Sequence, residues 1–311
     1  MKNKSFYSGL RQIARKTRFK AAPYPFRDPI FVIAPPRSGS TFLFDALSRL
    51  KGIVSLDYEA DGIWWDLFPY DRQESPSDRI APSEVDHSMR RSLRVQTYQL
   101  ATVQTECGTL RSLLQRFGIY PIRYLDKTIA NCFRVDVLRS VFPEAEFILL
   151  VRDPRANISS MIEGWSHVDR FGKPQLTPII ESISDATVEH WTYPAPPGWQ
   201  EVVNRPLPEI CAWSWKQHIE YALDFLTSSP PLVRVRYENL RDNPRDTLSR
   251  LASTLDTEIT EDLKAFLMET PESDTTVSSP RRGKWRKKNE EAIRSILPMV
   301  RETAQRIGYE V

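Results

Sequence analysis

The chain of 311 residues has few cysteines and no long apolar run. Its three cysteines, Cys107, Cys132 and Cys211, are an odd number without the close paired spacing of a disulfide framework or a zinc site. A reducing, cytoplasmic location is therefore the simpler expectation. No apolar stretch approaches the roughly 18 residues of a membrane-spanning helix, so no transmembrane segment is expected. Residues 1–28 read as a basic leader without the apolar centre of a signal peptide, and they could contact an anionic membrane surface.

The sequence also lacks a strong excess of charge of one sign. It has 43 basic and 40 acidic side chains, a net charge of +3, which argues against a dedicated nucleic-acid coat protein. Residues 281–288 carry six basic side chains in eight positions. A solvated loop explains this segment without a nucleic-acid partner, so none is expected.

Short apolar runs alternate with helical periodicity along the chain. Residues 30–34 and 146–151 are typical of buried parallel strands, and each precedes a segment with helical spacing. The pattern predicts an α/β fold, a P-loop-like three-layer sandwich with a central parallel sheet flanked by helices. Further strands are expected at 53–56, 122–125 and 232–235, and helices at 41–50, 83–115, 131–141, 209–226, 244–255, 262–268 and 290–307.

We expect residues 29–311 to form a single domain. Within it, residues 165–208 are rich in proline and tryptophan. This stretch is interpreted as an insertion of loops and short helices over the core, a lid or an acceptor wall.

Residues 35–41 form a tight Pro-Pro-Arg-Ser-Gly-Ser-Thr turn between a predicted strand and a predicted helix. The amino end of a helix offers unpaired N–H groups to an anion, and a glycine lets the backbone approach it. The first glycine and the lysine of a Walker A loop are both missing here, which disfavours a P-loop kinase or NTPase. An ordinary capped turn is the other alternative. The candidate anion-binding residues are Arg37, Ser38, Gly39, Ser40 and Thr41.

A second candidate phosphate site follows the predicted strand at 146–151. Arg152 leaves the end of this strand, and Ser160 lies eight residues later, about two turns into the next helix. An arginine can bind a phosphate through two parallel hydrogen bonds. A local ion pair between Arg152 and Asp153 is the simpler alternative.

Together the two segments resemble the phosphate sites of sulfotransferases that use 3′-phosphoadenosine 5′-phosphosulfate (PAPS), in the motif style of bacterial and tyrosylprotein members. In that family an Arg-Ser-Gly segment binds the 5′-phosphosulfate, and a strand followed by Arg-Asp-Pro-Arg and a serine binds the 3′-phosphate. The resemblance implies PAPS as donor, 3′,5′-adenosine bisphosphate (PAP) as product and no metal. The acceptor would be a hydroxyl or an amine of a small molecule, a lipid or a carbohydrate.

The resemblance extends to three further places. Lys127 matches a family lysine that approaches the sulfuryl group, and Tyr237 matches a tyrosine that frames the nucleotide. A basic region before the last helix matches the segment that closes over the nucleotide, and its candidates are Arg282, Gly283 and Lys284. A solvated lysine is the alternative for Lys127.

The resemblance also suggests a general base. Glu59 lies 22 residues after Arg37, just beyond the predicted second strand, where carboxylates often occur in Arg-Ser-Gly sulfotransferases. Asp57, Asp61 and His87 are alternatives, and a surface role for Glu59 is another. Arg37 and Lys127 would then stabilise the charge that develops on the leaving phosphate.

Aromatic residues gather in two parts of the sequence and could line an acceptor site, although such clusters are often core. They are Trp64, Trp65, Phe68, Tyr70, Trp191, Trp199, Trp213 and Trp215. A noncatalytic nucleotide-binding module remains a further alternative for the whole chain.

Overall fold

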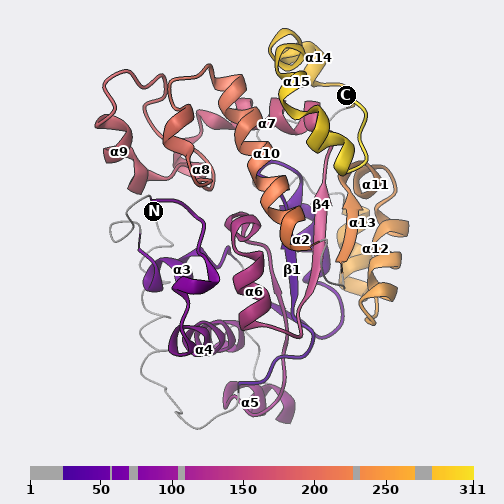
Figure 1. Cartoon of the computed structure of the whole chain (residues 1–311). Helices are drawn as coiled ribbons and strands as arrows, with labels where there is room; N and C mark the ends of the chain where they lie inside the picture. The colour runs from indigo at the N-terminus through magenta and orange to yellow at the C-terminus, as the bar shows by residue number, and fades with distance from the viewer. Residues whose placement is uncertain (1–23, 57, 70–75, 104–108, 227–231, 270–281) are drawn as a thin grey trace.

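The computed structural model describes residues 24–56, 58–69, 76–103, 109–226, 232–269 and 282–311. A five-stranded sheet with the order β2-β3-β1-β4-β5 lies at its centre (Figure 1). All neighbouring strands are parallel, and Ile30 pairs with Leu125 on one side and with Glu146 on the other. The strands are β1 (Ile30–Ile33), β2 (Ile53–Ser55), β3 (Arg123–Asp126), β4 (Glu146–Val151) and β5 (Leu232–Arg236).

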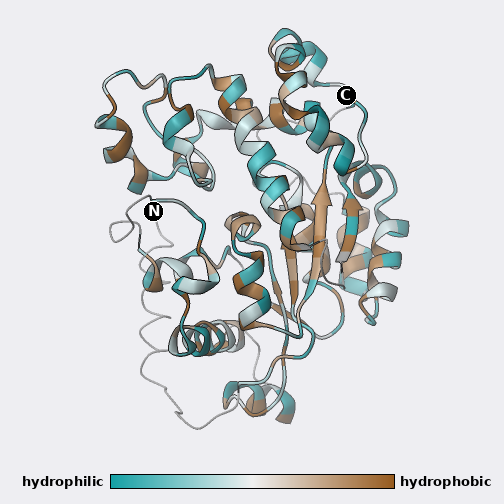
Figure 2. Ribbon diagram, in the orientation of Figure 1, coloured by the Kyte–Doolittle hydropathy of each residue, from teal (hydrophilic) through white to brown (hydrophobic). Residues whose placement is uncertain are grey.

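Helices cover both faces of the sheet because both faces are apolar (Figure 2). Successive residues of a strand point to opposite faces, so Phe31 and Ile33 belong to one core cluster while Ile30 and Val32 belong to the other. The second cluster packs on α2 (Ser40–Leu47), α11 (Tyr237–Asp242), α12 (Pro244–Thr254) and α13 (Glu261–Glu269). The first packs on α3 (Asp61–Leu67), α4 (His87–Val103), α6 (Val135–Val141), α7 (Pro154–Trp165), α10 (Leu207–Leu226) and α15 (Glu290–Arg306). The predicted three-layer α/β sandwich is confirmed.

The predicted elements differ from the structure mainly in their boundaries. The helical region expected at 83–115 is a single turn at η2 (Pro82–Glu84) followed by α4 and α5 (Leu110–Arg116). The helix expected at 131–141 begins as the 3₁₀ segment η3 (Ile129–Phe133) and continues as α6. No described helix is both long and apolar enough to cross a membrane.

Between α7 and α10, residues 166–206 fold as short helices joined by loops. The elements are α8 (Val168–Phe171), η4 (Pro174–Leu176), α9 (Thr177–Glu181) and η5 (Trp199–Val202). Trp191 and Trp199 are fully buried, with ring centroids 5.0 Å apart. The tryptophans therefore give this insertion an apolar interior that is continuous with the main core.

Candidate active site

The candidate functional residues follow the carboxyl ends of the strands. Residues 37–41 follow β1, and Lys127 follows β3. Arg152 follows β4, and Tyr237 follows β5. Because all five strands are parallel, these residues meet at one edge of the sheet, the usual place for a ligand in an open α/β fold.

The turn between β1 and α2 depends on a glycine. Gly39 is the N-cap of α2 and has a φ of 92°, in the left-handed region that favours glycine. A Cβ at this position would lie 2.5 Å from the Tyr237 ring. The hydroxyl of Ser38 is buried at the same turn and has no hydrogen-bond partner. A buried donor beside a helix amino end suits an anion.

Arg152 joins the two candidate phosphate segments. Its Nη1 donates a hydrogen bond to the backbone oxygen of Arg37 at 2.8 Å. Its guanidinium also lies over the Tyr237 ring, with Cζ 4.6 Å from the centroid. Burial lowers the pKa of Arg152, but an arginine remains charged at neutral pH. The segments around Arg37 and Arg152 are therefore in direct contact, and Tyr237 touches both.

The simpler interpretation of Arg152, an ion pair with Asp153, is not what the geometry favours. Asp153 pairs with Arg155 through Nη2 and Oδ2 at 2.8 Å and caps α7 by accepting from the Arg155 backbone N–H at 2.9 Å. Its own N–H donates to Glu238, which also accepts from Tyr309. Asp153 and Glu238 thus fix the turn into α7, which leaves Arg152 directed at the turn after β1.

Sequence reasoning missed Asn157, which lies on α7 between Arg152 and Ser160. Asn157 is fully buried and donates from Nδ2 to the backbone oxygen of Pro36 at 2.7 Å. It therefore ties α7 to the turn after β1. The only available signal was a polar residue on the apolar face of a predicted helix. Ser160 itself is half-buried.

Glu59 and Lys127 form an ion pair. Lys127 Nζ lies 2.7 Å from Glu59 Oε1, and the backbone N–H of Ile129 donates to Oε2 at 3.2 Å. The Glu59 side chain retains 34% of its exposure, whereas the Lys127 side chain retains 10%. A carboxylate can accept about four hydrogen bonds, so Glu59 can still receive a proton from a ligand. The structure thus places neither residue as an isolated surface charge.

The alternative bases lie in different surroundings. Asp61 is buried between Arg134, 3.0 Å away, and Lys173, 3.6 Å away. Burial would raise its pKa, but Lys173 and Arg134 outweigh this effect and hold the pKa below its ordinary value. His87 is exposed at the first residue of α4, and Asp57 lies outside the described residues.

Arg37 extends beneath the insertion. Its guanidinium lies over the Phe171 ring, with Cζ 4.7 Å from the centroid. Burial lowers the pKa of Arg37. Nearby, the Tyr193 hydroxyl donates to the Met161 backbone oxygen at 3.0 Å, and a Cβ on Gly164 would lie 2.2 Å from this hydroxyl. Phe171 of the 165–208 segment therefore lies over the arginine of the turn after β1.

The basic segment before α15 lies against α7. Lys284 Nζ pairs with Glu163 of α7 at 2.7 Å, and Arg282 pairs with Asp242 of α11. Gly283 has a φ of 65°, and α14 (Trp285–Lys288) begins with the buried Trp285. Arg282, Gly283 and Lys284 thus lie beside the helices that carry the phosphate candidates, although the structure shows ion pairs for their charged groups.

The aromatic residues considered for an acceptor wall divide into core residues and partly buried ones. Trp191, Trp199 and Trp215 are fully buried and belong to the core, because they pack against other apolar side chains. Trp65, Phe68 and Trp213 are partly buried, and Tyr70 lies outside the described residues. Trp65, Phe68 and Trp213 therefore remain candidates for contact with an acceptor.

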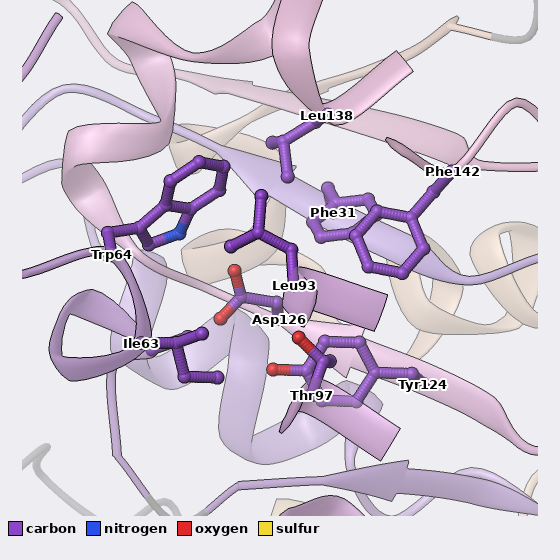
Figure 3. Close-up of a pocket in the computed structure, with 10 residues that line it drawn as sticks. Phe31, Ile63, Trp64, Leu93, Thr97, Tyr124, Asp126, Leu138 and Phe142 are labelled. Atoms are coloured by element: carbon purple, nitrogen blue, oxygen red, sulfur yellow. The ribbon is translucent and has the colours of Figure 1, made fainter. Parts of the chain in front are cut away.

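Trp64 lines a small cavity behind β3 rather than an open surface (Figure 3). Asp126, Thr97 and Tyr124 bring oxygen atoms to this cavity, and Phe31 is among its apolar lining. It has room for about one water molecule. It is therefore not a binding site for an acceptor.

A profile of the sulfotransferase family matches residues 29–194, which is 166 of the 311 residues and includes both phosphate segments. The chain belongs to the sulfotransferase family. It is accordingly a transferase enzyme with a nucleotide-binding fold. No curated protein sequence matches this sulfotransferase significantly.

Solved sulfotransferases are similar to the chain at low sequence identity. One from Mycobacterium avium is 14% identical, with 97% of this chain and 82% of that chain covered and a TM-score of 0.51. A mouse sulfotransferase, SULT7A1, complexed with PAP is 14% identical, with 90% and 86% covered and a TM-score of 0.47. One from Alicyclobacillus acidocaldarius is 13% identical, with 92% and 97% covered and a TM-score of 0.47. The similarity to the Mycobacterium avium enzyme supports the fold.

Proposed function

We propose that this sulfotransferase transfers the sulfuryl group of PAPS to a hydroxyl or an amine of a small-molecule, lipid or carbohydrate acceptor. Residues 37–41 would hold the 5′-phosphosulfate, and Arg152 with Ser160 would hold the 3′-phosphate. The observation that carries the proposal is the hydrogen bond from Arg152 to the backbone of Arg37, with Tyr237 in contact with both segments. One nucleotide with two phosphate groups fits two anion sites this close together.

The donor set at this edge of the sheet fits such a nucleotide. Ser38 Oγ and Arg152 Nε are buried without hydrogen-bond partners, and both are donors. A buried donor left unpaired costs about 1–3 kcal/mol, which a bound phosphate oxygen would recover. Tyr237 supplies an aromatic face at the same place, and Lys284 is near enough to α7 to close over it.

PAPS supplies an activated sulfuryl group and a phosphate leaving group. The residues of the chain then have three tasks. Glu59 accepts the proton of the acceptor, Lys127 orients Glu59, and the charges of Arg37 and Lys127 oppose the negative charge that develops on the leaving phosphate. Trp65 and Phe68, on and after α3, are partly buried aromatic side chains that could contact an apolar or sugar-like acceptor.

The nucleotide assignment is tested by thermal unfolding with PAP and, separately, with ATP and magnesium. A ligand at 100 times its dissociation constant stabilises a protein by about 2.7 kcal/mol. We expect the larger increase in melting temperature with PAP. A larger increase with ATP and magnesium would favour the kinase or NTPase alternative.

The catalytic assignment is tested with Glu59→Gln, after an acceptor has been identified by mass spectrometry from a panel supplied with labelled PAPS. Glutamine keeps the size of the side chain but cannot take the proton. We expect unchanged PAP affinity and a turnover lower by about 10²–10⁴-fold. The matched control is Glu258→Gln, which removes an exposed pair with Lys51 at 2.8 Å. Transfer by Glu59→Gln at the wild-type rate would exclude Glu59 as the base. No labelled product from the wild type with any acceptor of the panel would favour a noncatalytic module.

We further propose that residues 29–311 fold as one unit after the basic leader. One core cluster supports this, since it includes Phe31 of β1, Trp191 of the insertion and Ile296 of α15.

A cytoplasmic location is supported by Cys132 and Cys211, which are buried as free thiols.

A further inference from the structure

Exposed apolar side chains are concentrated in one short part of the chain. Among the described residues, the large hydrophobic side chains that remain exposed are Leu110, Leu113, Phe117, Ile119, Tyr120 and Met268. All but Met268 lie within residues 110–120, where Leu110 is 72% exposed and Ile119 is 57% exposed. Single exposed apolar residues are ordinary, but a contiguous group on one element marks an interaction surface.

Helix α5 leaves these side chains exposed because its apolar face points toward solvent and its polar face points toward the protein. Leu110, Leu113 and Phe117 have the i, i+3, i+7 spacing that places side chains on one helical face. That face points outward, while the polar residues Ser112 and Gln115 are buried. An amphipathic helix that docks on its own core shows the opposite arrangement.

Specific hydrogen bonds fix this reversed orientation. Thr109 Oγ1 accepts the Ser112 backbone N–H at 3.1 Å, and Ser112 Oγ accepts the Thr109 N–H at 3.1 Å, which together form a capping box. Gln115 Nε2 donates to the backbone oxygen of Pro121 at 3.2 Å. The polar face of α5 is therefore held inward, and the leucines are left at the surface.

The segment that carries this face has a positive charge. Residues 107–125 contain no aspartate or glutamate, and Arg111 and Arg116 are exposed on α5 itself. Exposed apolar side chains with a basic rim complement the surface of an anionic bilayer.

The face also lies away from the candidate active site. Phe26 pairs with Ile122 in a bridge that precedes both β1 and β3, so residues 117–122 are at the amino ends of the strands. Figure 1 shows α5 beyond this end, whereas the phosphate candidates follow the carboxyl ends. A protein docked through α5 would keep its nucleotide site open.

We propose that α5 and residues 117–120 form a surface that binds anionic phospholipid membranes. The apolar side chains enter the boundary between headgroups and acyl chains, and Arg111 and Arg116 contact the lipid phosphates. The amino edge of the sheet then faces the membrane.

The test is co-sedimentation of the full chain with vesicles of phosphatidylcholine alone or mixed with phosphatidylserine. We expect binding to the mixed vesicles at least about tenfold tighter than to the neutral ones, and weaker binding at high salt. The variant Leu110→Ser/Leu113→Ser/Ile119→Ser should lose about tenfold or more in affinity for the mixed vesicles. The matched control is Met268→Ser, which changes a side chain that is 69% exposed on α13.

Melting temperature, with and without PAP, shows that each variant is folded and separates this proposal from the proposed function. Equal binding by the triple variant and the wild type, or no binding of the wild type to either vesicle, would overturn the proposal. So would a dimer seen by analytical ultracentrifugation that the triple variant disrupts, because a second copy would then be the partner of this face.

Discussion

Asp126 illustrates how strongly the surroundings of a single residue can change its chemistry. It is the last residue of β3, and its carboxyl is buried beside the cavity in Figure 3. Burial raises its pKa to about 7, against the opposing effect of hydrogen bonds from Thr128 at 2.9 Å and Asn131 at 2.6 Å. The native state therefore binds a proton here that the unfolded chain releases near pH 4.

This difference predicts a pH-dependent contribution to stability. Because the pKa of Asp126 is higher in the native state, its protonated carboxyl stabilises the fold at a pH below the pKa of the unfolded chain. This stabilisation is lost as the pH rises to about 7. The free energy of unfolding of the wild type, relative to Asp126→Asn, should fall by up to about 1.4 kcal/mol per pH unit over this interval. Urea unfolding of both proteins between pH 5 and about 8 measures it. A constant difference across that range would contradict the prediction.

Residues whose place follows from the local sequence pattern could be predicted. Residues whose burial or pairing depends on contacts with distant segments could not. Arg152 follows a recognisable strand, and the residue that it contacts belongs to a second recognisable turn. By contrast, nothing near Asp126 in the sequence indicates its burial, because helices α3, α4 and α6 supply much of the surrounding wall. The pairing of Glu59 with Lys127, 68 residues apart, also needed the sheet order β2-β3.

At the scale of elements, α7 holds the turn after β1 as well as carrying Ser160. Asn157 donates to the Pro36 backbone oxygen from the buried face of this helix. Removing the donor leaves that oxygen unsatisfied and frees the turn to move relative to Arg152. We therefore expect Asn157 to be a positioning residue, which would affect nucleotide binding through this turn.

We expect Asn157→Ala to lower PAP affinity about tenfold and the free energy of unfolding by about 1–3 kcal/mol. Calorimetric titration and urea unfolding measure the two effects. The control is Ser159→Ala on the same helix, which removes the buried hydrogen bond from Asn289 at 2.9 Å. This control should lose stability but keep its PAP affinity. Equal PAP affinity in both variants would show that Asn157 has only a structural role.

The elements themselves were largely predictable because parallel strands buried on both faces are continuous apolar runs. The run at 146–151 coincides with β4, and Pro154 begins α7 as its position after a strand indicates. Short turns such as η3 were not distinguished, since a single helical turn has too few residues for a periodic pattern. The reversed face of α5 was missed because periodicity gives the apolar side of a helix but not the side that is buried.

At the scale of the whole molecule, a buried group of four charges joins the insertion to the core. Arg134 contacts Asp61 and Asp78 at 3.0 and 2.9 Å, and Lys173 of the insertion lies 3.6 and 3.7 Å from the same carboxylates. Asp78 also accepts the Ala195 backbone N–H at 2.7 Å. Two positive and two negative groups balance each other here. These residues are far apart in the sequence, so their balance could not be predicted from it.

Removing one charge from this balanced group should therefore affect both the free energy of unfolding and the turn at residues 37–41. Lys173→Met leaves a buried negative charge uncompensated, which costs about 3–5 kcal/mol of unfolding free energy. It should also weaken PAP binding, because the insertion that Lys173 anchors places Phe171 over Arg37. Lys51→Met is the control, since it removes an exposed pair with Glu258 and should cost at most about 1 kcal/mol. Urea unfolding and PAP titration of the two variants measure the difference, and a similar small loss in both would mean that the four buried charges do not hold the insertion in place.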